Sequence, residues 1–237
     1  RNTVREFAEK EIAPRAAHYD DTSEFPWDNV HGLGDLGLFG LGVDEAYGGS
    51  GGTTRQVAIA IEEIARACAA TSTTYAAHLS LAVEFIQMFG TEGQKRQFIP
   101  PLVTGRSIAA FALTEASGGS DAGSLQTTAT HSNGAYILNG SKTYITNAPE
   151  ADVFVLLATM DRSLGTRGVI ALVMERDTPG LTINPLGKKM GIRASSTAEV
   201  VFDNCAVPVE NRLGSEGEGF RATMEMLNQS RISISAQ

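Results

Sequence analysis

The spacing of apolar residues changes near residue 107 and changes back near residue 219. Before the first change, apolar side chains recur every three or four positions, as in Val57, Ile61 and Ile64, and this spacing predicts amphipathic helices. Between the two points apolar and polar residues alternate, which predicts strands. The last segment returns to helical spacing. Because helices and strands occupy separate stretches, the pattern excludes a doubly wound βαβ fold and predicts an α+β protein.

The alternating stretch contains eight segments that read as strands and two turn signals. The segments are residues 108–114, 125–130, 135–138, 142–145, 153–158, 169–175, 181–184 and 199–202. The pairs Asn133–Gly134 and Asn139–Gly140 predict tight turns. In the helical part, Pro100 and Pro101 predict a break in the last helix. The predicted order is a helical domain over residues 1–108, a β barrel or sandwich over 109–214, and the first helix of another helical domain over 215–237.

Composition narrows the class of protein. The chain has 237 residues, 42% hydrophobic and 19% charged, which is typical of a globular protein rather than a disordered one. The net charge of −8 argues against nucleic acid as a partner, because nucleic-acid binding needs a basic surface. No apolar run is long enough to cross a bilayer, and four scattered histidines show no metal-binding spacing. The two cysteines do not suggest a disulfide framework, so we expect an intracellular setting.

Two polar segments of the β-like part carry candidate binding chemistry. The loop FALTEASGGSDAGS, residues 111–124, has glycines that let a ligand approach the backbone, and hydroxyl and N–H groups that can hold an anion. In NGSKTYITNA, residues 139–148, alternation places Tyr144 and Thr146 on one side of a strand, where an aromatic plane and a hydroxyl can hold a planar heterocycle. Taken singly, a polar connection and an ordinary strand face are the commoner interpretations of such segments.

Two further segments place cations near other polar groups. Lys188, Lys189 and Arg193 form a basic cluster that suits a phosphate, although such clusters are usually solvated loops. Asn228 and Arg231 lie three residues apart on one face of the last helix, so both can reach one ligand, or can simply pair at the surface. No Ser-His-Asp or Cys-His arrangement is readable.

Together and in this order, the segments resemble the acyl-CoA dehydrogenase family over essentially the whole chain. LTEASGGSD resembles the first signature of that family, with Ala116 in place of the usual proline. YITNA, GIRASSTAEVVFDNCAVPVENRLG and the pattern of the last helix complete the series, and LGLFGLGVDEAYGGSGG resembles the family's N-terminal loop. The resemblance implies an N-terminal helical domain, a middle β barrel and a C-terminal four-helix bundle, of which the chain carries the first helix, with FAD held where the three meet.

The resemblance also implies an activity and partners. The expected reaction is α,β-dehydrogenation of an acyl-CoA thioester in fatty acid β-oxidation, with electrons passed to an electron-transfer flavoprotein. A short or branched acyl chain, a homotetramer, and a location in the bacterial cytoplasm or the mitochondrial matrix are expected on the same ground. Two rival hypotheses stay open, namely an acyl-CoA oxidase or flavin monooxygenase on this scaffold, and a non-catalytic relative that binds acyl-CoA.

Residue by residue, the resemblance implies which positions contact the ligands. The FAD-binding positions are Phe111, Leu113, Thr114, Gly119, Ser120, Tyr144, Ile145 and Thr146. Tyr144 stands where the family usually has tryptophan against the flavin, and Thr146 where a hydroxyl approaches flavin N5. The substrate-binding positions are Ser120, Asn228 and Arg231, with Asn228 in place of a common aspartate.

The family's catalytic base is not found at the positions that the chain contains. Some members carry a glutamate one residue before the arginine of the last helix, and here that residue is Ser230, which cannot act as a carboxylate base. Most other members place the glutamate far along the C-terminal domain. The chain starts without methionine and stops within a helical pattern, so we expect the base beyond Gln237 and assign no catalytic residue within the chain.

Overall fold

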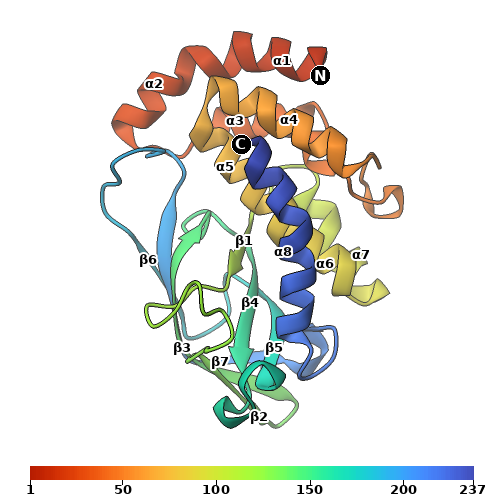
Figure 1. The fold of residues 1–237 in the computed structure, drawn as a ribbon, viewed down its shortest axis with the longest axis vertical. Coiled ribbons are helices and arrows are strands. Elements are labelled where there is room, and N and C mark those ends of the chain that lie inside the picture. The colour runs from red at the N-terminus through yellow and green to blue at the C-terminus, as the bar shows by residue number, and fades with distance from the viewer.

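The computed structural model describes residues 1–237 and shows helices at one end, a sheet at the other, and a last helix lying along both (Figure 1). The helices and the short 3₁₀ or π segments, labelled η, are α1 (Asn2–Phe7), η1 (Ala8–Ile12), α2 (Ala13–Thr22), α3 (Trp27–Asp35), η2 (Leu38–Gly40), η3 (Glu45–Tyr47), α4 (Thr54–Ala67), α5 (Ala69–Ala77), η4 (His78–Val83), α6 (Glu84–Phe89), α7 (Glu92–Leu102), η5 (Arg162–Gly168), η6 (Val209–Asn211) and α8 (Gly219–Ala236). The strands are β1 (Ala109–Ala112), β2 (Thr128–Ser132), β3 (Ala135–Thr146), β4 (Val153–Thr159), β5 (Val169–Glu175), β6 (Leu181–Pro185), β7 (Thr197–Pro208) and β8 (Arg212–Leu213). The α+β order predicted from the apolar spacing is confirmed.

Helix α4 illustrates how the helical spacing becomes packing. Thr53 caps its first turn, since its hydroxyl accepts the N–H of Gln56 and the Gln56 amide oxygen accepts the N–H of Thr53 at 2.8 Å. Val57, Ile61 and Ile64 then fall on one buried face. The apolar stripe seen in the sequence is therefore the face that α4 turns toward the core.

The predicted break at Pro100 and Pro101 is wrong. Helix α7 continues through both prolines and ends at Leu102. The prolines lie in the last turn, and the carbonyls that lose an N–H partner there belong to Arg96 and Gln97, which are exposed. Water can satisfy those two carbonyls, so the helix does not have to stop.

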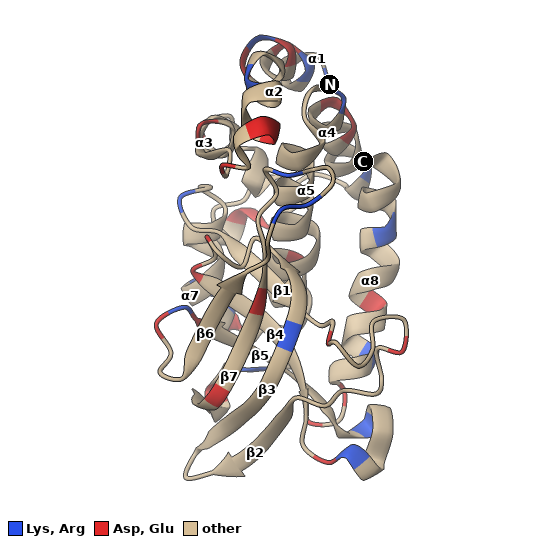
Figure 2. Ribbon diagram, turned by 90° about the vertical axis from the view of Figure 1, so that its left-hand side faces the viewer, with Lys and Arg blue, Asp and Glu red and all other residues tan.

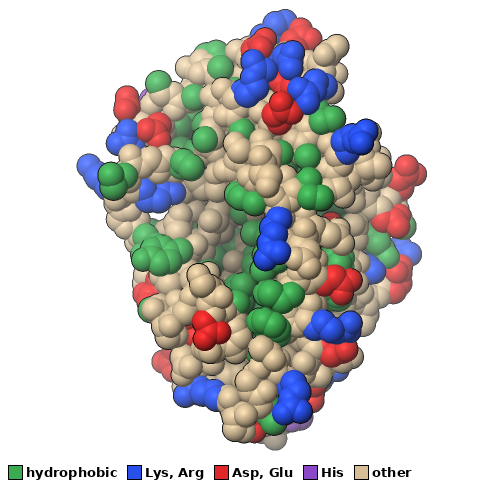
Figure 3. Space-filling view, viewed as in Figure 1, with side chains coloured by type: hydrophobic (Ala, Val, Ile, Leu, Met, Phe, Trp, Pro, Cys, Tyr) green, Lys and Arg blue, Asp and Glu red, His purple; other side chains and the backbone are tan.

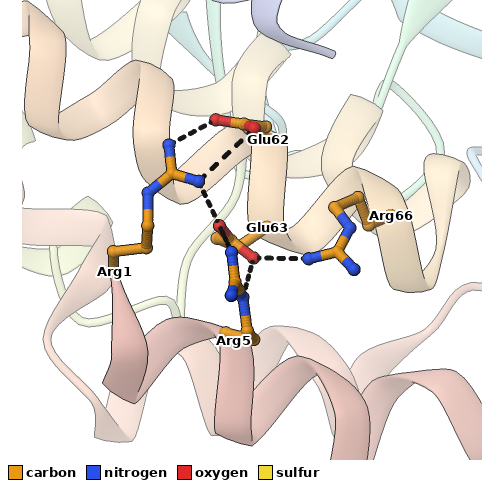
Figure 4. Close-up of polar contacts among 5 residues, drawn as sticks. All are labelled: Arg1, Arg5, Glu62, Glu63 and Arg66. Carbon is orange, nitrogen blue, oxygen red and sulfur yellow. Dashed lines mark hydrogen bonds and ion pairs between the residues drawn. The ribbon is translucent and has the colours of Figure 1, made fainter.

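A buried carboxylate fastens α1 to α4 (Figure 4). Glu63 is 1% exposed and accepts two hydrogen bonds of 2.8 Å from the Arg5 guanidinium. Arg1 at 2.7 Å and Arg66 at 3.1 Å complete its shell. The hydrogen bonds from Arg5, reinforced by the charges of Arg5 and Arg1, lower the pKa of Glu63 to about 2 against the effect of its burial. The buried charge is thus compensated on several sides.

Eight strands form one sheet in the order β6-β7-β3-β2-β4-β5-β8, with β1 paired parallel to β4. Strands from the two halves of this order share one hydrophobic core. It includes Leu138 of β3 and Phe202 of β7 from one half, and Phe154 of β4 and Leu172 of β5 from the other. The sheet therefore folds over on itself. A single parallel residue pair between β2 and β4 forms the corner between the two halves.

Strand β3 joins two segments that the sequence analysis separates. The predicted turn at Asn139–Gly140 is wrong, because the chain stays paired with β7 on both sides of a register shift between Leu138 and Gly140. Gly140 has φ +143°, and a Cβ there would lie 2.7 Å from the Thr127 Cα. A close approach of two backbones requires this glycine, not a turn. The other predicted turn, at Asn133–Gly134, is confirmed, with φ of 49° and 78°.

The helical part and the sheet share a second hydrophobic core of 40 buried residues. It includes Val155 of β4 and Met226 of α8 beside the side chains of α4. Hydrogen bonds reinforce this junction, since Gln94 Nε2 donates to the carbonyl oxygens of Glu210 at 2.6 Å and Arg212 at 2.8 Å. The domain limits predicted at residues 108 and 214 stay predictions.

Charged residues gather at the α1 end and in the loops, while the strands carry few of them (Figure 2). Both cysteines, Cys68 and Cys205, are buried free thiols. None of the helices combines the length and the apolar character needed to span a membrane.

Candidate ligand-binding site

A cavity of about 320 Å³ lies among α5, η4, the end of β3 and α8. It brings together Thr146 and Arg231, which the sequence analysis assigns to the cofactor and the substrate. Ala77, Leu81 and Leu227 supply apolar lining. Figure 3 shows the surface hollowed beside α8, with hydrophobic side chains around the hollow. Thr146 and Arg231 are 85 positions apart in the sequence, and the fold brings them into one site.

The loop that follows β1 is held on β3 by a buried ion pair that sequence reasoning missed. Lys142 Nζ lies 2.7 Å from Glu115 Oε1 and donates to the Leu113 carbonyl at 3.2 Å. The Glu115 carboxylate also accepts the N–H groups of Gln126 at 2.6 Å and Thr127 at 3.0 Å. The sequence offers one glutamate in a small-residue loop and one lysine in an apolar strand pattern, and nothing that pairs them.

Burial and pairing act differently on the two partners. Burial alone would raise the pKa of Glu115, but Lys142 and the hydrogen bonds outweigh it and lower that pKa below its usual value. Burial lowers the pKa of Lys142 to about 8, and the carboxylate opposes this shift. With both groups ionised near neutral pH, the pair anchors both ends of the loop.

Tyr144 lies beside this anchored loop in an unusual conformation. It has φ +58° at a register shift of β3 against β7, and the residue is 69% exposed. The Thr143 N–H donates to the Thr114 carbonyl at 2.8 Å, so Thr114 is adjacent to the bulge. A left-handed backbone at an exposed aromatic residue is rare and clusters at functional sites. The Tyr144 ring is thus presented outward on a fixed backbone.

The remaining cofactor positions divide between core and surface. Phe111 and Leu113 are partly buried against the core that the helices and the sheet share, and Ile145 is 2% exposed within the core of the sheet alone. Gly119 folds back toward Thr114, since a Cβ on it would lie 3.5 Å from Thr114 Cγ2. Ser120 is exposed. The N–H groups of Gly119 and Ser120 have no acceptor within the protein.

The predicted substrate residues on α8 contact each other. The Arg231 guanidinium donates to Asn228 Oδ1 at 2.7 Å, and both side chains are exposed. Of these two residues, Arg231 lines the cavity and Asn228 does not. Ser230 lines it too, with its hydroxyl donating to the Leu227 carbonyl at 3.1 Å. No aspartate or glutamate lines this cavity, so the chain places no carboxylate base there.

The basic cluster of the β6–β7 connection is partly engaged within the protein. Arg193 pairs with Asp20 of α2 at 2.7 Å and also donates its backbone N–H to that carboxylate at 3.0 Å. Lys189 donates to the Ser195 carbonyl and to Thr197 Oγ1. Arg193 therefore fastens α2 to the β6–β7 connection. Of the three cations, Lys189 and Arg193 are engaged within the protein, while Lys188 is exposed. No group of three or more His, Cys, Asp or Glu side chains could hold a metal ion.

The donor set fits the FAD that the resemblance implies. Tyr144 offers an exposed aromatic face, and the Gly119 and Ser120 N–H groups are free to bind an anion. Two buried polar atoms, Thr74 Oγ1 and Asn147 Oδ1, have no partner in the protein. They lie close together, because Asn147 Nδ2 donates to the Thr74 carbonyl at 3.0 Å, one residue after Thr146. Unsatisfied buried groups of this kind are expected where a polar ligand edge completes the hydrogen bonding.

Comparison with known proteins matches two family models along the chain. The acyl-CoA dehydrogenase N-terminal domain matches residues 1–106, and the acyl-CoA dehydrogenase middle domain matches residues 110–205. The chain is 44% identical, over all 237 of its residues, to the short-chain specific acyl-CoA dehydrogenase of Clostridium acetobutylicum, of which it covers 62%.

Solved structures agree with this assignment. Butyryl-CoA dehydrogenase from Megasphaera elsdenii has a TM-score of 0.95 at 40% identity, with 99% of this chain and 62% of that chain covered. A chain from a study of the electron transferring flavoprotein of Acidaminococcus fermentans and of flavin-based electron bifurcation has a TM-score of 0.96 at 41% identity, with 99% and 62% covered. The chain spans about three fifths of the length of these relatives. By its two domain matches and its full-length similarity, the chain belongs to the acyl-CoA dehydrogenase family.

Proposed function

We propose that the protein containing this chain is an FAD-dependent acyl-CoA dehydrogenase that converts a short acyl-CoA to the 2-enoyl-CoA. The observation that carries the proposal is the cavity of about 320 Å³ that joins Thr146 to Arg231 beside the anchored loop. A cavity of that volume suits a short acyl chain. The names of the relatives, a short-chain specific acyl-CoA dehydrogenase and a butyryl-CoA dehydrogenase, support the same substrate class.

The cofactor-binding residues are proposed from the family positions and from their surroundings. Tyr144 would pack on the flavin ring, Thr114 and Thr146 would offer hydroxyls, and the N–H groups of Gly119 and Ser120 would bind a phosphate. Phe111, Leu113 and Ile145 would shape the site from the core side. When bound, FAD supplies a two-electron acceptor for the hydride of the β carbon.

The chain's own contribution is to hold the thioester and exclude water. Arg231 at the cavity mouth would bind the CoA portion, aided by Asn228, which orients its guanidinium. Removal of the α proton needs a base, and the Ser230 hydroxyl, which donates its hydrogen bond to the Leu227 carbonyl, is not a carboxylate base. We therefore infer that a carboxylate outside these 237 residues enters the cavity.

Further expectations follow from family membership. We propose an electron-transfer flavoprotein as the electron acceptor, supported by the subject of the Acidaminococcus fermentans study. We also propose a homotetramer, and a location in a bacterial cytoplasm or a mitochondrial matrix.

The test uses the full-length protein purified with FAD. Anaerobic addition of butyryl-CoA should bleach the flavin absorbance near 450 nm within the dead time of manual mixing, since typical turnover is about 1–10³ per second. Re-oxidation by an electron-transfer flavoprotein, with slow reaction with oxygen, marks a dehydrogenase. Rapid oxygen consumption would assign an oxidase instead. Flavin that binds normally yet is never bleached by any acyl-CoA would leave the non-catalytic relative as the correct hypothesis.

A further inference from the structure

A second cavity, of about 350 Å³, adjoins the cavity that Thr146 and Arg231 line. The two cavities share three lining residues, Ser80, Ser230 and Ser233. Ser80 Oγ donates to Ser233 Oγ at 2.9 Å, so small side chains, two of them joined by a hydrogen bond, lie where the two cavities adjoin. A ligand hydroxyl or amine can replace either partner of such a bond without a change of backbone.

The second cavity is polar where an acyl pocket is expected to be apolar. Besides the shared serines, its lining residues include Thr53, Thr54, Gln229 and Glu84. Only three of its twelve lining residues are hydrophobic. A methyl-terminated chain entering it would remove water from these groups without replacing their hydrogen bonds, which is unfavourable.

Glu84 is the unusual member of this lining. It is half-buried at the start of α6 and has neither a hydrogen-bond partner nor an ion-pair partner. The two more deeply buried glutamates of the chain are paired, Glu115 with Lys142 and Glu63 with three arginines. Burial raises the pKa of Glu84, as expected for a carboxyl group without a compensating cation. A cation or a hydrogen-bond donor at this carboxyl group would offset the free-energy cost of burying its charge.

We propose that the second cavity receives the far end of the acyl chain and that Glu84 accepts a hydrogen bond from an amino or hydroxyl group at that end. The inference rests on the proposed function and narrows its substrate class to short acyl thioesters with a terminal donor group. A terminal carboxylate is disfavoured, because Glu84 would repel it. The thioester itself stays in the first cavity, near Thr146 and Arg231.

The test compares four CoA thioesters with the same six-carbon chain and with amino, hydroxyl, methyl or carboxylate ends. For each, kcat/KM is measured by flavin reduction and Kd by calorimetry, using full-length FAD-loaded protein. Compared with the methyl-terminated thioester, we expect the amino- and hydroxyl-terminated ones to have a kcat/KM about tenfold or more higher and a Kd about tenfold or more lower, since an unpaired polar site discriminates strongly. The carboxylate-terminated thioester should be the poorest.

Three variants locate the selectivity. Glu84→Gln should reduce the preference for the amino end and keep the hydroxyl end, and Glu84→Leu should make the methyl end the best substrate. Glu9→Gln, an exposed glutamate on η1 without an ion pair, is the matched control and should change nothing. A melting temperature and flavin spectrum like those of the parent protein establish that each variant is folded.

The outcomes separate this inference from the proposed function. Equal Kd values for all four ends, or a preference for the methyl end in the parent protein, would overturn the inference. So would a Glu84→Gln variant that binds flavin but reduces it with no thioester, because Glu84 would then take part in the chemistry. If no thioester bleaches the flavin but the Kd values follow the predicted order and respond to Glu84→Gln, the proposed activity is wrong and the site assignment holds.

Discussion

His78 is a single residue on which the junction of helices and sheet depends. It is fully buried, and its Nδ1 accepts the N–H of Ala109 at 3.0 Å. The other nitrogen, Nε2, must therefore carry the proton and donate to the Leu102 carbonyl at 3.2 Å. Burial lowers the pKa of His78 to about 4, although the hydrogen bond to Leu102 opposes the shift. The neutral ring fits both partners, and a protonated ring would lose its acceptor.

This gives a pH-dependent stability with a defined sign. The unfolded chain binds a proton at His78 near pH 6.5 and the folded chain only near pH 4, so acid favours unfolding between those values. The loss should reach about 3 kcal/mol at the acid end, from 1.36 kcal/mol per pKa unit. Urea unfolding at half-unit pH steps measures it. His78→Gln should flatten this part of the profile, and an unchanged slope would show that other groups cause it.

Lys142 is a second single residue on which a larger part of the structure depends, because it pairs with the carboxylate that holds the loop after β1. Lys142→Met leaves the buried Glu115 carboxylate without its cation, which should cost about 3–5 kcal/mol of unfolding free energy. Because Glu115 also holds the Gln126 and Thr127 N–H groups, the loop should loosen and FAD should dissociate more readily. Chemical unfolding and fluorescence titration with FAD measure the two effects. Lys188→Met, at an exposed lysine of the same protein, is the control; equal effects of both substitutions would contradict the structural role of the pair.

Motifs predicted single residues better than pairs of residues. Thr146 and Arg231 were assigned from the segments that contain them, and the structure brings both into one cavity. The contacts of Lys142 with Glu115 and of Ser80 with Ser233 were not predicted, because their partners lie 27 and 153 positions apart. Such contacts are set by tertiary packing, and one sequence contains no signal that joins them.

At the scale of elements, Gly140 shows why a turn signal can be misleading. An Asn-Gly pair has the same local preference for positive φ in a turn and in a bulge, so local chemistry does not separate the two. The chain forms a turn if the segments on either side of the Asn-Gly pair hydrogen-bond to each other, and a bulge if both pair with a third strand. Here both pair with β7, and the glycine lies against Thr127.

Two alanine substitutions test this interpretation of the bulge. Gly140→Ala must place a Cβ 2.7 Å from the Thr127 Cα at φ +143°, so it should cost more than about 2 kcal/mol of unfolding free energy. Gly134→Ala, in the confirmed turn at φ +78° with nothing within 4 Å, should cost only about 1 kcal/mol. Urea denaturation ranks the two. The reverse ranking would mean that the contact with Thr127 relaxes easily.

On the scale of the whole molecule, the order of helices and strands was predictable from the sequence, but their packing around one shared core was not. The change from helical to alternating spacing is local information, and it correctly separated the two parts of the chain. The shared core mixes Ile61 and Phe98 from the helices with Val155 and Val173 from the sheet, and sequence order says nothing about that mixture. The cavity lined by Thr146 and Arg231 forms because α8 packs against both the helices and the sheet.

A shared core predicts that helices and sheet unfold together. Native-state hydrogen exchange should give the same opening free energy for amides around Ile64 in α4 and around Val173 in β5, because both side chains lie in the shared core, which is lost when either part opens. Gln94→Ala removes the two hydrogen bonds to Glu210 and Arg212, and should lower both opening free energies by the same amount, about 1–3 kcal/mol. Exchange measured by mass spectrometry on the full-length protein resolves the two peptides. If the α4 peptide opened at a lower free energy than the β5 peptide, the helices would be a separate folding unit, and the ligand cavity between them and the sheet would be a contact between two independently stable parts.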